Sequence, residues 1–222
     1  MNGRHELKYS INAADCAQIR ARLRAVAKLD ENARVDGSYK IRSLYFDNYS
    51  DKAVTEKLSG ISKREKYRLR LYNGDISFIR LERKSKQNRL TYKESAAITA
   101  KEVEKLLTGD YSALKHKEQP LLMELYAKIM YQNLRPMSIV EYSREAYIYP
   151  VGNVRVTFDS EIKTTNNIAV FLQENLVAIP AIASIVLEIK YDGFIPDIIR
   201  DCVKIAHRSQ SEYSKYVAAR MV

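Results

Sequence analysis

The clearest feature of the sequence is an alternation of apolar and polar residues in eight segments. A period of two is typical of β-strands whose two faces meet different surroundings, and these segments are rich in Val, Ile, Tyr and Phe. The pattern predicts strands at 4–10, 39–48, 64–73, 76–85, 89–95, 138–148, 152–161 and 184–191. The turn-forming sequences Asn73-Gly74-Asp75 and Gly152-Asn153 separate two pairs of these strands, as in β-hairpins.

Helical patterns lie between the predicted strands. They predict helices at about 12–28, 100–108, 119–133, 195–206 and 212–220. Thr99 and Glu102 have the spacing of a capping box at the start of the second helix. Loop signals are short, and the chain contains no linker, repeat or low-complexity tract. The pattern therefore predicts one α+β domain over residues 1–222.

Each predicted strand has one apolar and one charged face. In the strand 64–73, Tyr67, Leu69 and Leu71 alternate with basic residues. The charged faces together carry Arg4, Glu6, Lys8, Lys66, Arg68, Arg70, Arg80, Glu82, Lys84, Lys93, Tyr142, Arg144, Arg155, Thr157, Asp159, Glu161, Glu188 and Lys190. Arg and Lys dominate this set, with a few isolated carboxylates among them.

Two geometries fit these faces. In an open sheet packed on a core, the charged face is the solvated one. Alternatively, eight strands close into a barrel with apolar residues outside, beneath helices, and charges in the lumen. Buried charges are costly unless they are paired, so such a lumen would require a polyanion and a divalent cation. Carboxylates would then hold the metal, and guanidinium groups would bind phosphate oxygens in pairs.

Composition narrows the class of partner. The 222 residues include 37 Lys or Arg and 27 Asp or Glu, which gives a net charge of +10 and a pI of about 9.4. A hydrophobic content of 46% excludes a disordered polycation. The charge favours an anionic partner, and composition alone leaves nucleic acid, acidic lipid and a phosphate-rich small molecule open.

Other features point to a cytoplasmic protein without a membrane span. The polar amino terminus lacks the apolar core of a signal peptide. The longest apolar run, 176–187, contains Pro180 and is too short to cross a bilayer. Cys16 and Cys202 are expected to be reduced, packed side chains, with a disulfide as the less favoured alternative.

Motifs for other chemistries are missing from the sequence. The seven glycines are scattered, so no glycine-rich phosphate loop is present. His5, His116, His207 and the two cysteines lack the spacing of zinc ligands.

A series of short motifs nevertheless resembles a known family. In chain order they are Arg4-His5-Glu6-Leu7-Lys8-Tyr9, Ser43-Leu44-Tyr45-Phe46-Asp47, Lys66-Tyr67-Arg68-Leu69-Arg70, Leu81-Glu82-Arg83-Lys84, Val140-Glu141-Tyr142-Ser143-Arg144, Val154-Arg155-Val156-Thr157-Phe158-Asp159, Leu187-Glu188-Ile189-Lys190-Tyr191-Asp192-Gly193 and Tyr213-Ser214-Lys215-Tyr216. This order resembles the VTC (vacuolar transporter chaperone) polyphosphate polymerase domain, one of the CYTH-like triphosphate tunnel metalloenzymes. The resemblance covers most of the chain. It implies an eight-stranded antiparallel β tunnel, a closed barrel with a charged lumen and helices outside, that binds triphosphate and metal.

The resemblance also implies roles for individual residues. The catalytic set is Arg68, Arg70, Lys84, Arg144, Arg155 and Glu188. Further substrate contacts are expected from Lys8, Lys66, Arg80, Lys93, Tyr142, Lys190, Ser214 and Lys215. Glu188 resembles the metal-binding glutamate of the family, and Glu6, Glu82 and Asp159 are expected as further metal ligands from their phase on the charged strand faces. Glu212 stands where a basic residue is expected, which leaves open how tightly this end of the tunnel holds a product.

The leading hypothesis by resemblance is a polyphosphate polymerase that uses Mn²⁺ or Mg²⁺. Its partners would be a nucleoside triphosphate and inorganic polyphosphate. A metal-dependent triphosphatase and a non-catalytic polyphosphate- or nucleotide-binding module are the alternatives. Nucleic acid is not expected, because the basic residues alternate with apolar ones on strands instead of forming an exposed basic helix. The oligomeric state is left open.

Overall fold

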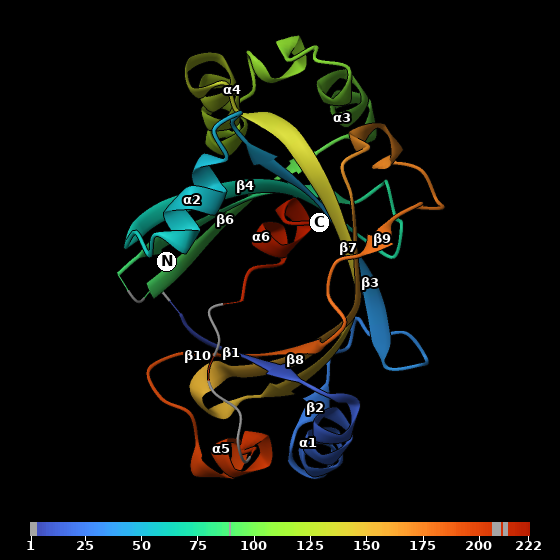
Figure 1. The fold of residues 1–222 in the computed structure, drawn as a ribbon, viewed down its shortest axis with the longest axis vertical. Helices are drawn as coiled ribbons and strands as arrows, with labels where there is room; N and C mark the ends of the chain where they lie inside the picture. Colours follow the sequence, from blue (N-terminus) through green and yellow to red (C-terminus); the bar gives the residue numbers. More distant parts are fainter. Residues whose placement is uncertain (1–3, 89, 206–209, 211–212) are drawn as a thin grey trace.

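One antiparallel sheet organises the chain in the computed structural model, which describes residues 4–88, 90–205, 210 and 213–222 (Figure 1). Its strands are β1 (His5–Ile11), β2 (Lys28–Leu29), β3 (Ser38–Asp47), β4 (Lys63–Tyr72), β5 (Ile79–Gln87), β6 (Leu90–Ile98), β7 (Arg135–Tyr149), β8 (Val154–Thr165), β9 (Ile179–Pro180) and β10 (Ile185–Tyr191). The main path runs β1-β10-β8-β7-β3-β4-β5-β6, with β2 paired to β7 and β9 paired to β8. The eight predicted strands are the eight strands of this path.

The two end strands of the path meet at one point. Arg4, just before β1, exchanges two backbone hydrogen bonds with Thr91 of β6, at N–O distances of 3.1 and 3.3 Å. Within the described residues no further ladder joins β1 to β6, so the sheet is curled but not closed by hydrogen bonds. The α+β class and the antiparallel sheet are therefore confirmed, whereas a closed barrel is not.

The described residues contain six α-helices. They are α1 (Ala13–Val26), α2 (Lys52–Leu58), α3 (Ala100–Leu107), α4 (Pro120–Gln132), α5 (Asp197–Val203) and α6 (Lys215–Arg220). The capping box at Thr99 and Glu102 is confirmed. The pattern missed α2, a seven-residue helix whose N-cap residue, Asp51, has a left-handed backbone and makes no side-chain capping hydrogen bond. The predicted positions 89, 206 and 212, and with them Glu212 and His207, lie outside the described residues.

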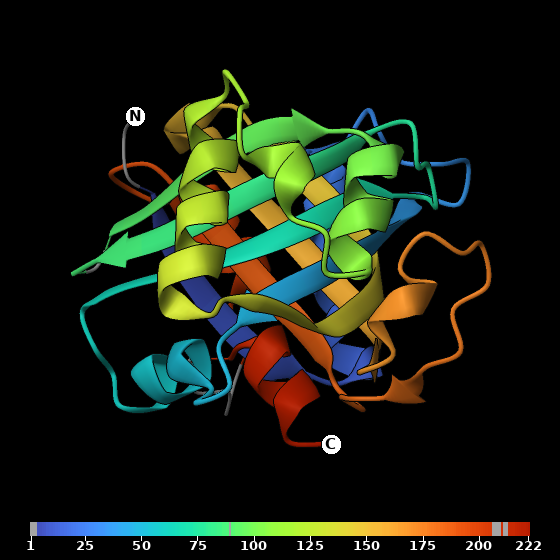
Figure 2. The ribbon, with the colours of Figure 1, turned by 90° about the horizontal axis from the view of Figure 1, so that it is seen from above.

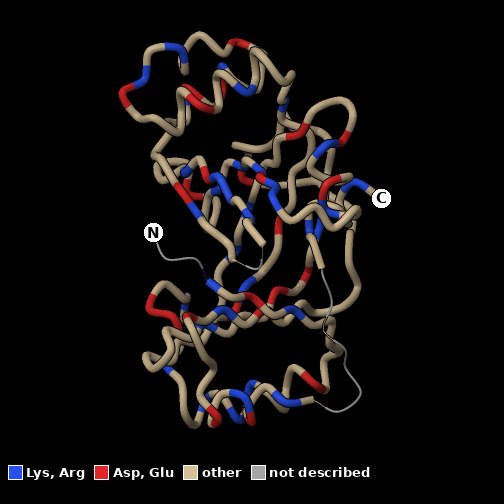
Figure 3. Tube along the Cα trace, turned by 90° about the vertical axis from the view of Figure 1, so that its left-hand side faces the viewer, with Lys and Arg blue, Asp and Glu red and all other residues tan. Residues whose placement is uncertain are grey.

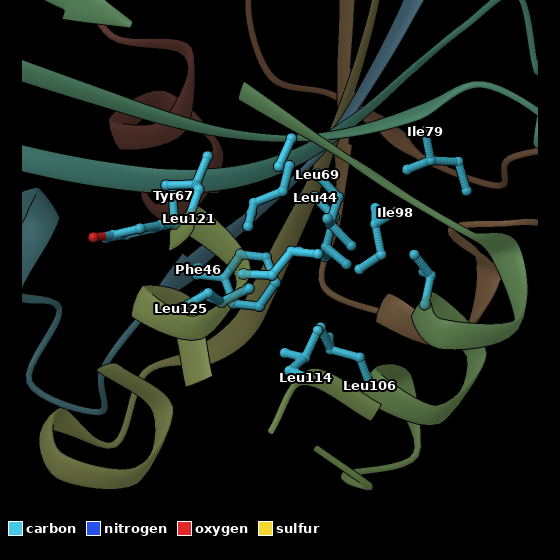
Figure 4. Packing of buried hydrophobic residues seen from close by; sticks show 14 of the residues in the cluster. Leu44, Phe46, Tyr67, Leu69, Ile79, Ile98, Leu106, Leu114, Leu121 and Leu125 are labelled. Atoms are coloured by element: carbon cyan, nitrogen blue, oxygen red, sulfur yellow. The ribbon is translucent and has the colours of Figure 1, made fainter. Parts of the chain in front are cut away.

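Two helical layers cover the outer surface of the curled sheet. Figure 1 shows α1 and α5 beneath β1, β8 and β10, and α3 and α4 lie across the strands on the opposite side (Figure 2). The apolar strand faces pack beneath these layers, as the alternation predicts: Leu69 of β4 and Leu125 of α4 belong to one buried cluster (Figure 4). The opposite strand faces, which carry most of the charges, point into the interior.

The short helix α6 lies at one open end of the curled sheet (Figures 1 and 2). Its Tyr216 is buried, stacks on Tyr45 of β3 at 5.0 Å between ring centroids, and donates a hydrogen bond to Asp47 at 2.9 Å. Arg220 adds two hydrogen bonds to the carboxylate of Asp51. These contacts attach the carboxy-terminal helix to β3 and α2.

Two smaller expectations can also be compared with the structure. Cys16 and Cys202 are both buried and neither forms a disulfide, as expected. None of the helices in the described part of the chain has the length and apolar composition needed to cross a membrane.

The turn before β8 allows a first prediction. Gly152 has a φ of 71°, and a Cβ at this position would lie 2.7 Å from the carbonyl oxygen of Phe194. Gly152→Ala is expected to lower the free energy of unfolding by about 2 kcal/mol or more, because both the backbone and the contact become strained. Gly74→Ala is the matched control, since Gly74 has a φ of 77° and an added Cβ there would meet no described atom within 4 Å. Urea denaturation should show the smaller loss for Gly74→Ala, and equal losses would contradict a role for the Phe194 contact.

Candidate functional site

A cavity of about 60 Å³ lies inside the curled sheet, next to α6. It is lined by Lys8, Tyr45, Lys66, Arg68, Arg70, Lys84, Tyr142, Arg144, Glu188, Lys190, Ser214 and Lys215. Among these described residues, eight side chains are cationic and one is a carboxylate. Figure 3 shows charged positions along the strands between the two helical layers. We call this space the inner cavity.

Strand alternation explains how so many cations reach one cavity. On β4, Tyr67 and Leu69 are buried beneath the outer helices, so the intervening Lys66, Arg68 and Arg70 point inward. The same alternation operates on β1, β7 and β10. The curled sheet then brings these strands around a common space, although β1 and β4 are far apart in the strand order.

Glu188 is the carboxylate of the inner cavity. Its oxygens lie 3.4 Å from Lys8 Nζ, 3.0 Å from Lys190 Nζ and 3.8 Å from an Nη atom of Arg144. Burial by itself would raise the pKa of Glu188, but the neighbouring ammonium and guanidinium groups hold that pKa well below its usual range. Glu188 is therefore ionised and shared among three cations.

Glu82 and Asp159 have dedicated cationic partners beside the cavity. Glu82 pairs with Arg68 at 2.7 Å and with Lys93 at 2.6 Å. Asp159 accepts hydrogen bonds from Arg144 Nε and Nη2 at 2.6 and 2.7 Å, and Lys215 Nζ lies at 2.5 Å. Burial opposes ionisation of Asp159, but these cations lower its pKa to about 2. Both carboxylates therefore stabilise the arrangement of the arginines.

Lys66 has a different environment from the other inner cations. It has no ion-pair partner among the described residues, and its Nζ lies 5.7 Å from the centre of the Tyr45 ring. Burial, and then the positive charges of Lys84, Lys8 and Arg68, lower the pKa of Lys66 well below its usual range. An anion in the cavity would relieve this repulsion, so the arrangement of charges favours anion binding.

Lys84 carries a second pH-sensitive charge. Its Nζ contacts both carboxylate oxygens of Glu6, at 2.7 and 2.8 Å. Burial lowers the pKa of Lys84 to about 8 despite this ion pair. Burial also opposes ionisation of Glu6, yet Lys84 and the other lysines bring the pKa of Glu6 down to about 2.

We expect the affinity for an inorganic phosphate chain to depend on the charge of Lys84. The group is cationic below its folded pKa of about 8 and neutral above it, so binding should weaken as the pH rises through this value. With metal chelated, the affinity for tripolyphosphate should fall about tenfold between roughly pH 7.5 and 9.5 relative to Lys84→Arg, which keeps its charge. Calorimetric titration at each pH measures the difference. Parallel pH profiles for the two proteins would contradict the prediction.

Two tyrosines organise the cations. The Tyr142 ring lies 5.3 Å from the Arg144 guanidinium and 4.8 Å from Lys215 Nζ, and its hydroxyl accepts a hydrogen bond from Arg70 at 3.2 Å. Tyr45 accepts a hydrogen bond from Arg68 at 3.2 Å. The sequence pattern predicts Tyr142 as a site residue but not Tyr45, although the phase of Tyr45 on the predicted strand 39–48 points to the same face.

Comparison with known proteins places this arrangement in a family. The sequence matches the VTC domain over residues 3–222, nearly its whole length. The chain belongs to the VTC domain family. No curated protein matches this VTC domain.

Solved structures share the fold of this VTC domain at low sequence identity. The PH1012 protein from Pyrococcus horikoshii is 14% identical with a TM-score of 0.52, and the match covers 97% of this chain and 98% of that one. A proposed adenylate cyclase from Bacillus halodurans is 11% identical with a TM-score of 0.51, covering 90% and 87% of the two chains. At these identities the likeness supports the fold alone.

Most of the residues predicted for the site meet at the inner cavity of the VTC domain, and three basic ones do not line it. Arg80 donates a hydrogen bond to Ser95 at 2.9 Å. Lys93 contacts Glu82 with its side chain half exposed. Arg155 is paired with Asp30, a residue that the sequence analysis did not select.

A larger outer chamber of about 150 Å³ adjoins the inner cavity of the VTC domain. The two spaces share Lys8, Lys66, Lys84 and Ser214 in their linings, so they lie next to each other. Ser214 also accepts a hydrogen bond from Val217 N as the N-cap of α6, which holds this residue at the junction.

The carboxylates differ in how well they fit the role of metal ligands. The described residues contain no group of three or more His, Cys, Asp or Glu side chains that could hold a metal ion. Mg²⁺ sites that bind phosphates often use only one or two carboxylates, with substrate oxygens as the other ligands. Glu188 and its neighbour Glu6, on paired strands, fit this smaller requirement. Glu82 and Asp159 fit it less well, because neither lines the inner cavity or the outer chamber beside it.

Proposed function

We propose that this VTC domain is a metal-dependent polyphosphate polymerase. It would transfer the γ-phosphoryl group of a nucleoside triphosphate to an inorganic polyphosphate chain. The observation that carries the proposal is the inner cavity, where eight cations surround a single carboxylate among the described lining residues. A linear chain of phosphates supplies the negative charges that this cavity lacks, and its paired oxygens match guanidinium groups.

The proposed roles follow the positions of the side chains. Arg68, Arg70 and Arg144 would hold the phosphates that react, with Lys84 beside them. Further contacts would come from Lys8, Lys66, Tyr142, Lys190, Ser214 and Lys215, with Arg80, Lys93 and Arg155 towards the edges. Glu188, with Glu6, would hold Mg²⁺ or Mn²⁺, which neutralises charge on the transferring phosphoryl group. Residues 1–222 would act as one tunnel domain in the cytoplasm.

The ionised state of the carboxylates favours phosphoryl transfer over hydrolysis. A hydrolase must activate water, and an efficient general base has a pKa near the working pH. Glu6 and Asp159 each have a pKa of about 2, and the pKa of Glu188 is also well below its usual range. A polyphosphate acceptor is already an anion and needs no such base. The inner cavity therefore suits a phosphate acceptor better than water.

The decisive experiment separates polymer from free phosphate. Purified protein is incubated with ATP and Mn²⁺ or Mg²⁺, and long-chain polyphosphate and inorganic phosphate are measured in parallel. The proposal predicts metal-dependent polyphosphate, which disappears when the metal is chelated. Release of phosphate alone would support the triphosphatase, and tight binding of tripolyphosphate without either product would support the binding module. Lys101→Gln, an exposed change on α3, should leave the product unchanged.

A further inference from the structure

Asp30 is a buried carboxylate that belongs to none of the predicted strands. It follows β2 and is 4% exposed. Its backbone N–H donates to the carbonyl of Ala146 on β7 at 2.9 Å. One carboxylate oxygen accepts hydrogen bonds from the backbone and side-chain nitrogens of Asn32, at 3.0 and 2.8 Å. Asp30 is therefore fixed in place before any ligand binds.

The second carboxylate oxygen of Asp30 is used by Arg155. It accepts a hydrogen bond from Arg155 Nη2, and the same Nη2 donates to the hydroxyl of Tyr39 at 2.8 Å. Burial would raise the pKa of Asp30, but the hydrogen bonds from Asn32 and Arg155 lower it, so the carboxylate is ionised. A fixed negative charge and a tyrosine hydroxyl thus hold the Nη2 atom of the guanidinium.

The rest of the Arg155 guanidinium is available to a ligand. Its Nε and Nη1 make no hydrogen bond to any described residue, and neither is among the buried polar atoms that lack a partner. The Arg155 side chain is 28% exposed, against 3% for Asp30. Each of these two donors can therefore give a hydrogen bond to a phosphate oxygen.

The position of Arg155 on the sheet places it beside the inner cavity. Arg155 is the cross-strand partner of Lys190, which lines the cavity. Tyr39, which holds the same guanidinium, is the cross-strand partner of Arg144. The Asp30–Arg155 pair thus lies beside two strand positions whose side chains line the cavity.

We propose that Asp30 is a positioning residue that orients Arg155 towards the end of a phosphate chain bound in the inner cavity. The inference rests on the proposed function, because it assigns the ligand as a chain of phosphates. Asp30 touches no phosphate itself. It keeps the guanidinium in one orientation, so that less rotational freedom is lost when a phosphate is bound.

Asp30 could instead compete with the phosphate for Arg155. The two roles predict opposite changes in polyanion affinity when Asp30 is replaced. If Asp30 merely neutralised Arg155, its removal would release a cation and strengthen binding of a polyanion. If Asp30 orients Arg155, its removal weakens binding. The sign of the change in affinity for one substitution therefore distinguishes the two roles.

The experiment measures the calorimetric dissociation constant of inorganic tripolyphosphate with and without Mg²⁺. Asp30→Asn keeps the size of the side chain and removes its charge. It is expected to weaken binding about tenfold, the effect of losing one hydrogen bond between charged groups. In an Arg155→Gln background, the same substitution should change the dissociation constant by less than about twofold. Glu31→Gln, an exposed adjacent acid, is the charge-matched control and should bind like the wild type.

A second variant protects the test against a folding defect in Asp30→Asn. Tyr39→Phe retains the ring and removes the hydroxyl that Arg155 contacts. Like Asp30→Asn, it should weaken tripolyphosphate binding, and it should do so only when Arg155 is present. Tighter binding by Asp30→Asn, or an equal loss with and without Arg155, would overturn the inference while leaving the proposed function in place. No binding of tripolyphosphate by the wild type would overturn both.

Discussion

Replacing Glu188 by Gln is expected to separate metal-dependent turnover from phosphate binding. Turnover with Mn²⁺ or Mg²⁺ should fall at least about a hundredfold, because the variant lacks the carboxylate best placed to hold the metal. Binding of tripolyphosphate in the presence of a chelator should be as tight as in the wild type or tighter. The reason is that Lys8, Lys190 and Arg144 all share the negative charge of Glu188, and its removal leaves them for the ligand.

Two measurements test this prediction: the steady-state rate with each metal and the calorimetric affinity with metal chelated. The free energy of unfolding without ligand should decrease, since three cations lose a partner, and tripolyphosphate should restore it. Glu104→Gln, an exposed change on α3, is the charge-matched control. A Glu188→Gln protein with wild-type turnover would refute the assignment of this residue to the metal.

The second large effect is expected at Arg70. Its side chain is 6% exposed, Glu82 lies 3.8 Å away, and its hydrogen bonds go to the hydroxyls of Ser43 and Tyr142. Arg144, by contrast, makes two hydrogen bonds to Asp159, so Arg70 has less ionic pairing to lose within the described structure. Arg70→Gln is therefore expected to weaken tripolyphosphate binding by about one to two orders of magnitude without comparable loss of stability.

A conservative variant separates charge from geometry at this position. Arg70→Lys keeps the positive charge but cannot form two parallel hydrogen bonds to one phosphate, so its affinity should lie between those of the wild type and Arg70→Gln. The affinities are compared by calorimetry at one ionic strength, because screening changes all of them. The exposed Lys101→Gln variant again controls for net charge. Equal affinities of Arg70→Gln and this control would contradict a role for Arg70 in the cavity.

Several local features followed directly from the sequence. The predicted strand 64–73 corresponds to Lys63–Tyr72, and the predicted hairpin at Asn73 is present. The capping box at Thr99 fixed the start of one helix. These features depend on residues close together in the chain, where side-chain alternation and caps act within a few positions.

Elements that lack a local signal were missed. The strands β2 and β9 have two residues each, too few to show alternation. Asp30 lies between a predicted helix and a predicted strand, and an acid in a loop has no periodic pattern that could reveal Arg155 as its partner. Arg155 and Arg144 therefore have the same predicted role, whereas the structure places them in different ion pairs.

Sequence alone determined that one face of each main strand is charged and the other apolar, because alternation is a property of the strand itself. It also predicted most residues of the inner cavity through their phase and their resemblance to a family. Only the tertiary structure decided which charges meet. Glu188 lies beside Lys8 because β10 pairs with β1, and Asp159 lies beside Arg144 because β8 pairs with β7. Strand order and register set these contacts, and both depend on packing between residues that are distant in the chain.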